Sequence, residues 1–399
     1  MVLFGTFLDR RCKMNTAADW YTALKKKSDL FEGSHNIHTP QKLVEEILKK
    51  ITLADQKILV MFNLEFVVSL LHTHKINPKN ITLLSDHENK TLIAKDAGIN
   101  YITKLETDMK FDVVVGNPPY DKSTTTNSDK LWPVFLSKGL SLTNTTGYQS
   151  FITPPTFTSG TESVTDKGRK NLLKIFTTEH NLICLDYTAE THFNVGSRFV
   201  NSLVQVGVPY AKKTKIICTN GKEFEFDLSN VEALPLPVNI TYDTVNKFAK
   251  MQQKIGDKFY FKFNSGSDIA YSDGKDQDHE FEFLNASSNH KNKWGNKKNC
   301  PGNYFVHMCY NGSKFKFDYV INSEVSVMHN ARTWIIPEEY RETISYGILS
   351  SVFESDLFKE TVWANKFGQY NEPCFINKIA IPPLNKIYTN SDLLKWYGL

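Results

Sequence analysis

The chain has 399 residues, of which 41% are hydrophobic and 23% are charged. These values are typical of a soluble globular protein, and the length is sufficient for two domains with separate cores. The net charge of +4 permits a polyanionic partner without requiring one. Six scattered cysteines, with no C-x-x-C spacing, argue against a zinc site or a disulfide scaffold. We therefore expect no metal and a reducing compartment.

Residues 1–36 form an N-terminal extension with only some helical character. Its apolar run, Val2 to Leu8, is too short for a membrane helix. The charges that follow the run lie on the wrong side for a signal peptide. The extension is also too short for a nuclease domain. We expect a cytoplasmic protein that does not contact a membrane.

A helix is predicted to begin at His38-Thr39-Pro40, because Thr39 can serve as the N-cap and Pro40 suits the first helical position. Helical spacing gives this segment one apolar face, formed by Leu43, Val44, Ile47, Leu48 and Ile51. Taken alone, the segment is an amphipathic helix that packs on a core.

Residues 57–62 predict a first strand, followed by a turn and a helix through Leu71. No glycine occurs between Asp55 and Asp96, although a turn that receives a ligand against its backbone usually contains one. Asn63 and Glu65 are the only polar side chains at this turn. Either they face a ligand, or Asn63 only caps the following helix.

Residues 81–86 predict a second strand that ends in Asp86, and residues 100–102 a short third strand that starts with Asn100. A carboxylate at the end of the second strand is placed to accept hydrogen bonds from both hydroxyls of a ribose. Residues 111–115 form a β-branched run of the kind that a parallel sheet buries on both faces, and Gly116 ends it.

Asn117-Pro118-Pro119-Tyr120 follows this strand where its carboxyl end should open into a crevice. Two prolines make the loop stiff and leave its carbonyl groups free to accept hydrogen bonds. Asn117 adds a side-chain acceptor and Tyr120 an aromatic face. The loop therefore suits a planar group that carries an NH2, such as the exocyclic amine of a base.

This tetrapeptide after a strand resembles the catalytic motif of the N6-adenine DNA methyltransferases. Together with the leading Thr-Pro helix and the strand order, it is similar to the gamma class (TaqI/Eco57I-like) over residues 37–210. The resemblance implies a Rossmann-like α/β S-adenosylmethionine-dependent methyltransferase sheet. It also implies cofactor contacts from seven residues: Thr39, Pro40, Asn63, Glu65, Asp86, Asn100 and Asn117.

Further along, a helix over residues 131–142 and strands over 147–154, 182–186 and 200–206 continue the α/β pattern. Phe193 lies in the loop before the last of these strands. In the resembled family, a phenylalanine here packs on the flipped base opposite the catalytic tyrosine. Phe193 could also be an ordinary core residue at the end of a loop.

Residues 211–399 lose the alternating pattern and predict a mixed α+β target-recognition domain. Lysines between Asn285 and Asp318 alternate with aromatic residues and no acid, which indicates a DNA-reading surface. Arg332 is a second, weaker candidate. The expected DNA contacts are Lys291, Lys293, Lys297, Lys298, Lys314 and Arg332.

The sequence thus predicts transfer of a methyl group from S-adenosylmethionine to the N6 amine of a flipped adenine in double-stranded DNA. The resemblance implies a bacterial or phage-infected cell and a monomer, with a separate cognate restriction endonuclease as a partner. Two alternatives stay open. One is an enzyme that methylates an RNA base or a protein glutamine, and the other is a DNA-binding relative without a working cofactor turn.

Overall fold

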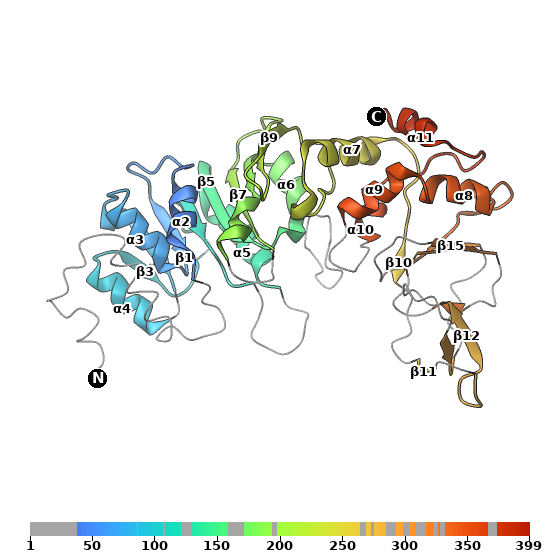
Figure 1. The fold of residues 1–399 in the computed structure, drawn as a ribbon. Helices are drawn as coiled ribbons and strands as arrows, with labels where there is room; N and C mark the ends of the chain where they lie inside the picture. Colours follow the sequence, from blue (N-terminus) through green and yellow to red (C-terminus); the bar gives the residue numbers. More distant parts are fainter. Residues whose placement is uncertain are drawn as a thin grey trace. The chain divides into compact units, whose positions relative to one another are not determined.

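The computed structural model divides the chain into two compact units (Figure 1). The first contains described residues from 38–155 and 171–229, and the second contains 156–158 and 230–399. Within residues 38–399, the description leaves out 86, 107, 121–129, 159–170, 194–197, 264–268, 273–274, 285–292, 298–303, 309–316, 322–325, 328–331 and 366–372. Residues 1–36, expected as an extension, also lie outside it.

The first unit is built on a nine-stranded sheet with the order β3-β2-β1-β4-β5-β7-β6-β8-β9. Strands β1 to β5 run parallel, and β7 is inserted antiparallel between β5 and β6. The strands are β1 (Ile58–Met61), β2 (Ile81–Leu84), β3 (Asn100–Ile102), β4 (Phe111–Gly116), β5 (Thr143–Thr153), β6 (Asn181–Asp186), β7 (Val200–Gln205), β8 (Thr214–Ile217) and β9 (Glu223–Phe226). This mostly parallel sheet confirms the predicted Rossmann-like methyltransferase fold class.

Five helices belong to this unit, among the residues that the structure describes: α2 (Gln41–Leu48), α3 (Leu64–His72), α4 (Glu88–Asp96), α5 (Trp132–Leu142) and α6 (Leu172–Thr178). The apolar face predicted for α2 is buried and contributes to one core with β1, β2 and β4. The predicted cap of α2 is wrong, however. Pro40 occupies the N-cap position, and no side chain caps the helix. The Thr39 hydroxyl has a different partner, described below.

The sheet continues beyond residue 210, where the sequence pattern suggested a domain boundary. Strand β8 pairs in parallel with β6, and β9 pairs with β8, so the first unit extends to Ser229. Alternating exposure along β9 differs from the buried strands near the centre of the sheet. An edge strand with one face in water lacks the continuous apolar run that marks a central parallel strand.

The second unit is mixed α+β. Its sheets have the orders β10-β17-β14-β15 and β11-β13-β12-β16. Its helices are α7 (Tyr242–Gln253), α8 (Tyr346–Phe353), α9 (Asp356–Ala364), α10 (Pro373–Ile376) and α11 (Asn390–Tyr397), and its strands are β10 (Lys262–Phe263), β11 (Tyr271–Ser272), β12 (Phe281–Leu284), β13 (Lys293–Gly295), β14 (Phe305–Met308), β15 (Phe317–Val320), β16 (Ser326–Val327) and β17 (Arg332–Ile335). Phe259 packs edge-on against Trp334 and Phe358 in its core.

Candidate active site

The candidate site lies where the chain reverses direction across the sheet. From β1 the chain proceeds to β2 and β3 on one side, whereas β4 and β5 lie on the other side of β1. In open parallel sheets, a crevice forms at the carboxyl ends of the two strands that flank such a switch point. Met61 pairs with Gly116 at these ends, and Asn117 follows directly.

Asn117 is buried, with 1% of its surface exposed, and two groups from other segments hold it. Its backbone N–H donates to Asn63 Oδ1 at 2.7 Å. Its side-chain Nδ2 donates to Thr39 Oγ1 at 3.3 Å. The Tyr120 hydroxyl donates to the remaining end of the amide, Oδ1. Four of the residues predicted as site residues therefore meet in one hydrogen-bond network.

Glu65 ties the start of α2 to this network. Its Oε1 accepts from the Thr39 backbone N–H at 3.4 Å and lies 2.7 Å from His38 Nδ1. Only 8% of Glu65 is exposed. His38 was not predicted as a site residue, although it precedes Thr39 in the same motif. Thr39 is held through its backbone by α3 and through its hydroxyl by Asn117.

The turn after β1 adopts the left-handed backbone that a glycine usually supplies, but phenylalanine provides it. Phe62 has a φ of 71°, a conformation that is rare for a bulky residue. Its N–H donates to Leu84 O at 3.0 Å, and its carbonyl accepts from Lys90 Nζ at 2.6 Å. Its ring packs edge-on against Phe135, with centroids 5.1 Å apart. The missing glycine in the sequence marked this turn but did not identify Phe62 or Lys90.

An aromatic cluster lies beside the Asn-Pro-Pro-Tyr loop. The ring of Tyr120 packs against Phe199, with centroids 5.3 Å apart, and Phe199 packs against Phe193 at 4.8 Å. Phe199 was missed, although it immediately precedes the predicted last strand. Burial raises the pKa of the Tyr120 hydroxyl, so it stays a proton donor to Asn117 throughout the ordinary pH range.

Several predicted residues lie elsewhere. Asn100 begins β3, at the end of the sheet opposite the crevice, and its Nδ2 donates to Lys79 O at 2.8 Å. Arg332 is 0% exposed in β17, so in this conformation it cannot reach a phosphate, and we no longer count it as a DNA contact. Lys297 is exposed. Asp86, Lys291, Lys298 and Lys314, and the side chain of Lys293, lie outside the described residues.

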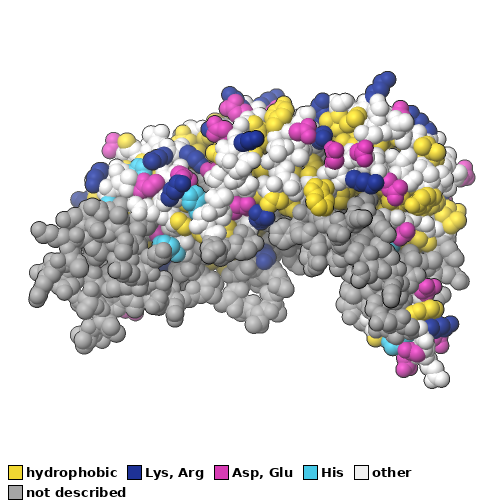
Figure 2. Space-filling model, in the orientation of Figure 1, with side chains coloured by type: hydrophobic (Ala, Val, Ile, Leu, Met, Phe, Trp, Pro, Cys, Tyr) yellow, Lys and Arg dark blue, Asp and Glu magenta, His cyan; other side chains and the backbone are white. Residues whose placement is uncertain are grey.

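The visible surface and the described helices add three findings. On the face shown in Figure 2, described Lys and Arg side chains are interspersed with acidic ones. No helix in the described part of the chain is long and apolar enough to cross a bilayer. Among the same residues, no group of three or more His, Cys, Asp or Glu is arranged to hold a metal ion.

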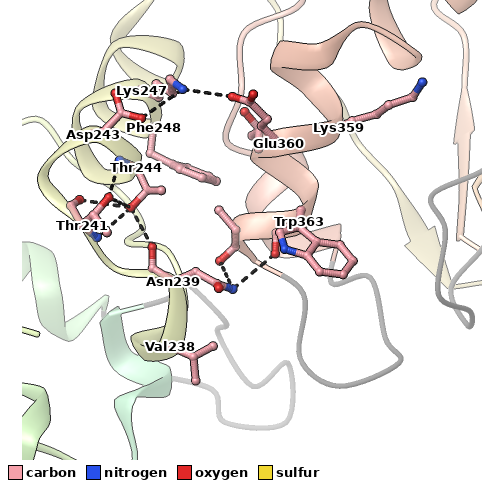
Figure 3. A pocket seen from close by; sticks show the side chains of 12 residues that line it. Val238, Asn239, Thr241, Asp243, Thr244, Lys247, Phe248, Lys359, Glu360 and Trp363 are labelled. Carbon is pink, nitrogen blue, oxygen red and sulfur yellow. Dashed lines mark hydrogen bonds and ion pairs between the residues drawn. The ribbon is translucent and has the colours of Figure 1, made fainter. Parts of the chain in front are cut away.

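The second unit contains a groove of about 740 Å³ between α7 and α9, shown in Figure 3. Lys247 pairs there with Asp243 and Glu360, each at 3.0 Å. Asn239 Nδ2 donates to the carbonyl groups of Trp363 and Ala364. The groove thus has a polar wall in which Lys247, Asp243 and Glu360 are already paired, and none of its lining residues belongs to the candidate site.

The sheet order, with β7 antiparallel, together with a buried Asn-Pro-Pro-Tyr loop at the switch point, defines a methyltransferase-type α/β unit. Residues 49–188 match the model of the Eco57I restriction-modification methylase family. The expected resemblance to Eco57I-like enzymes is thereby confirmed over this segment, which is less than half of the chain. No curated protein sequence matched the chain.

Solved structures with similar folds include three whose identity to this chain is 12% or lower. The type IIG restriction endonuclease BpuSI has a TM-score of 0.43 and 12% identity, covering 96% of this chain and 63% of its own. A proposed class I S-adenosylmethionine-dependent methyltransferase from Listeria monocytogenes has a TM-score of 0.39 and 12% identity, and the match covers 51% of this chain and 73% of that protein. A type I restriction-modification methyltransferase subunit from Streptococcus thermophilus has a TM-score of 0.38 and 11% identity, and the match covers 50% of this chain and 51% of that protein. The chain thus spans less than two thirds of either restriction-modification protein.

Proposed function

We propose that the protein transfers a methyl group from S-adenosylmethionine to the N6 amine of an adenine flipped out of double-stranded DNA, in a sequence-specific manner. The observation that carries this proposal is the placement of Asn117. Asn117 is buried at the carboxyl end of β4, where Asn63, just after β1, accepts from its backbone N–H and Thr39, just before α2, accepts from its side-chain NH2. Such an acceptor, next to a tyrosine ring, suits a planar base with an exocyclic amine.

The residues at the switch point fit S-adenosylmethionine. The turn after β1 keeps the left-handed conformation that a glycine would adopt there, although Phe62 supplies it. Asn63 and Glu65 place buried oxygens beside this turn, and a carboxylate there suits an ammonium group. Thr39, Pro40, Asn63, Glu65 and Asn117 would hold the cofactor. When bound, it supplies an electrophilic methyl group on a sulfonium.

The residues of the loop would activate the target amine. The lone pair of an aromatic amine is delocalised into the ring, so the nitrogen is a weak nucleophile. Acceptance of its two hydrogens by Asn117 Oδ1 and the Pro118 carbonyl would shift it toward tetrahedral geometry. Pro119 keeps this segment stiff. As the N–C bond forms and the sulfonium S–C bond breaks, the nitrogen would release one proton to water. Positioning then provides much of the rate enhancement, and no strong general base is needed.

Tyr120 would give up its present hydrogen bond when its ring stacks on the base. Its hydroxyl donates to Asn117 Oδ1 in the structure, and an amide oxygen has two acceptor sites. One site is therefore free for the amine, and the other becomes free when the tyrosine ring turns to stack on the base. Phe193, which is linked to Tyr120 through the buried Phe199, would pack on the opposite face of the base. Stacking repays part of the few kcal/mol that base flipping costs.

Recognition of DNA is assigned to the second unit. Lys297 is exposed and follows β13, and the expected contacts Lys291, Lys293, Lys298 and Lys314 lie nearby in the sequence. Lysines that contact phosphates position a duplex without reading its sequence, so base-edge contacts must come from other side chains of this unit. A separate cognate restriction endonuclease would then act on the same sites.

Transfer of tritium from labelled S-adenosylmethionine to double-stranded DNA, followed by nucleoside analysis for N6-methyladenine, tests the proposal. Asn117→Ala should lower transfer by at least a hundredfold with the fold retained. Asn220→Ala, on the exposed turn between β8 and β9, is the matched control and should transfer at the wild-type rate. Asn117→Ala with wild-type activity would reject the mechanism.

The same assay distinguishes the proposed function from its rivals. Labelling of RNA or of a protein glutamine in place of DNA would assign the site to one of those substrates, since an amide or another base also presents an NH2. Calorimetry with S-adenosylmethionine tests the remaining rival. No heat at millimolar cofactor would indicate a DNA-binding relative that lacks a working cofactor turn, for which the phenylalanine at the turn is the motivating observation.

A further inference from the structure

We propose that Thr39 is a positioning residue that sets which end of the Asn117 amide faces the target amine. This inference rests on the proposed function, because it assigns Thr39 a task in the chemical step as well as any contact with the cofactor. The Thr39 hydroxyl does not cap α2, whose N-cap is Pro40. It accepts instead from Asn117 Nδ2, in a position where both residues are at most 1% exposed.

The orientation matters because the two ends of an amide have opposite chemistry. The oxygen accepts hydrogen bonds and can withdraw a hydrogen of the target amine, whereas the NH2 end donates and would repel that amine. The two ends have nearly the same size, so packing alone cannot distinguish them. Only a partner that accepts or donates can.

Of the three hydrogen-bond partners of Asn117 described above, Thr39 is the one that can keep the amide oriented during the reaction. Asn63 holds the backbone N–H and is indifferent to the direction of the side chain. The Tyr120 hydroxyl donates to Asn117 Oδ1, but this hydrogen bond would be lost when the ring stacks on a base. Thr39 Oγ1 stays at the NH2 end and leaves the oxygen toward the crevice.

Thr39 is itself held firmly enough for this task. Its backbone N–H donates to Glu65 Oε1 at 3.4 Å, and Glu65 comes from α3, directly after the turn that contributes Asn63. Two of the three partners of Asn117, Asn63 and Thr39, are thus held by the segment that runs from β1 into α3. Replacement of the Thr39 hydroxyl by a methyl group would leave a buried NH2 without a partner, which favours rotation of the amide.

Thr39→Val keeps the shape of the side chain and removes the acceptor, and Thr39→Ser keeps the acceptor. Under saturating DNA and cofactor, we expect kcat of the valine variant to fall about tenfold, which corresponds to one hydrogen bond. KM for S-adenosylmethionine should change less than twofold, and serine should restore kcat to within threefold of wild type. A rise in KM with kcat unchanged would mean that Thr39 serves cofactor binding alone.

A double-mutant cycle with Asn117→Asp separates orientation from general support. An ionised carboxylate has two equivalent acceptor oxygens and no donor, so either rotation presents an oxygen to the amine. In the aspartate background, Thr39→Val should therefore cost less than threefold in kcat. An equal cost in both backgrounds would overturn the proposal, because a residue that only supports the loop acts independently of the chemistry at position 117.

A second readout does not depend on turnover. In cofactor-free protein labelled with 15N-asparagine, the side-chain NH2 signals of Asn117, assigned through Asn117→Asp, should shift in Thr39→Val and keep their positions in Thr39→Ser. Absence of a shift in the valine variant would overturn the proposal. A wild-type protein that transfers no methyl group, but shows this shift, would reject the proposed function and leave the hydrogen bond established.

Discussion

Strands β4 and β1 approach each other closely at Gly116, directly before the Asn-Pro-Pro-Tyr loop. The methyl group that Gly116→Ala adds tests this contact. An ideal Cβ at Gly116 would lie 2.6 Å from the backbone oxygen of Met61 and 3.2 Å from its Cβ. A backbone atom cannot turn aside as the tip of a side chain can, so Gly116→Ala must move the two strands apart. Overpacking of this kind costs about 1–3 kcal/mol.

We expect Gly116→Ala to destabilise β1 and β4 by about 2 kcal/mol, which corresponds to roughly 30-fold faster amide exchange. Hydrogen-exchange mass spectrometry of peptides covering Ile58–Met61 and Phe111–Gly116 measures this effect separately from the second unit. Methyl transfer should also fall, because Asn117 follows directly and depends on its alignment with Asn63.

Gly347→Ala, near the start of α8, is the control. The nearest atom to its added Cβ is Ile387 Cδ1 at 3.7 Å, an ordinary contact. Alanine in a helix is more stable than glycine by about 0.5–1 kcal/mol, so exchange in α8 should stay the same or slow. Wild-type exchange in β1 and β4 of Gly116→Ala, combined with full methyl transfer, would refute the packing argument.

Three further predictions concern single contacts. Phe62→Gly should be about 1 kcal/mol more stable than Phe62→Ala in urea unfolding, because only glycine adopts a φ of 71° without strain; the reverse ranking would contradict the strain. Lys50→Met should cost about 3 kcal/mol in the same assay, since it leaves Asp186, whose side chain is 4% exposed, without its cation. Asp186→Asn should cost less, because Lys50 can turn toward water. Burial, with a hydrogen bond to Asp257, raises the pKa of Tyr340 to about 12. The stability that the Tyr340 hydroxyl contributes is therefore complete below pH 10 and is lost as the pH rises from about 10 to 12. The Tm of Tyr340→Phe should fall less than the wild-type Tm over that pH range.

The central sheet could be predicted because its strands are buried on both faces. Residues 111–115, 81–84 and 100–102 are strands as expected, since a continuous β-branched run or a short apolar run between polar turns has few other uses in a soluble protein. Strands β8 and β9 were missed. Strand β9 alternates charged and apolar residues and β8 has only two apolar residues, patterns that are equally typical of strands in a separate domain.

The Asn-Pro-Pro-Tyr loop was recognisable from its residues as a candidate site, but the residues that hold it were not. Asn117 and Tyr120 belong to an unusual tetrapeptide that can be recognised in the sequence. The hydrogen bond between Thr39 and Asn117, by contrast, joins residues that are 78 positions apart. Helix-capping rules predicted Thr39 as the N-cap of α2, but its hydroxyl accepts a hydrogen bond from Asn117 instead. Arg332 shows the opposite failure, because nothing in the sequence around this arginine indicates that its side chain is buried.

The glycine-free turn bears directly on the choice between an enzyme and an inactive relative. A left-handed phenylalanine costs about 1–2 kcal/mol, which the bonds from Phe62 N–H to Leu84 O and from Lys90 Nζ to Phe62 O offset. An extended backbone at this position would avoid the strain altogether. The turn thus keeps the shape that a bound ligand needs even though the residue that normally permits this shape is absent. A strained conformation held by a buried lysine is typical of functional sites, and it favours a working cofactor turn.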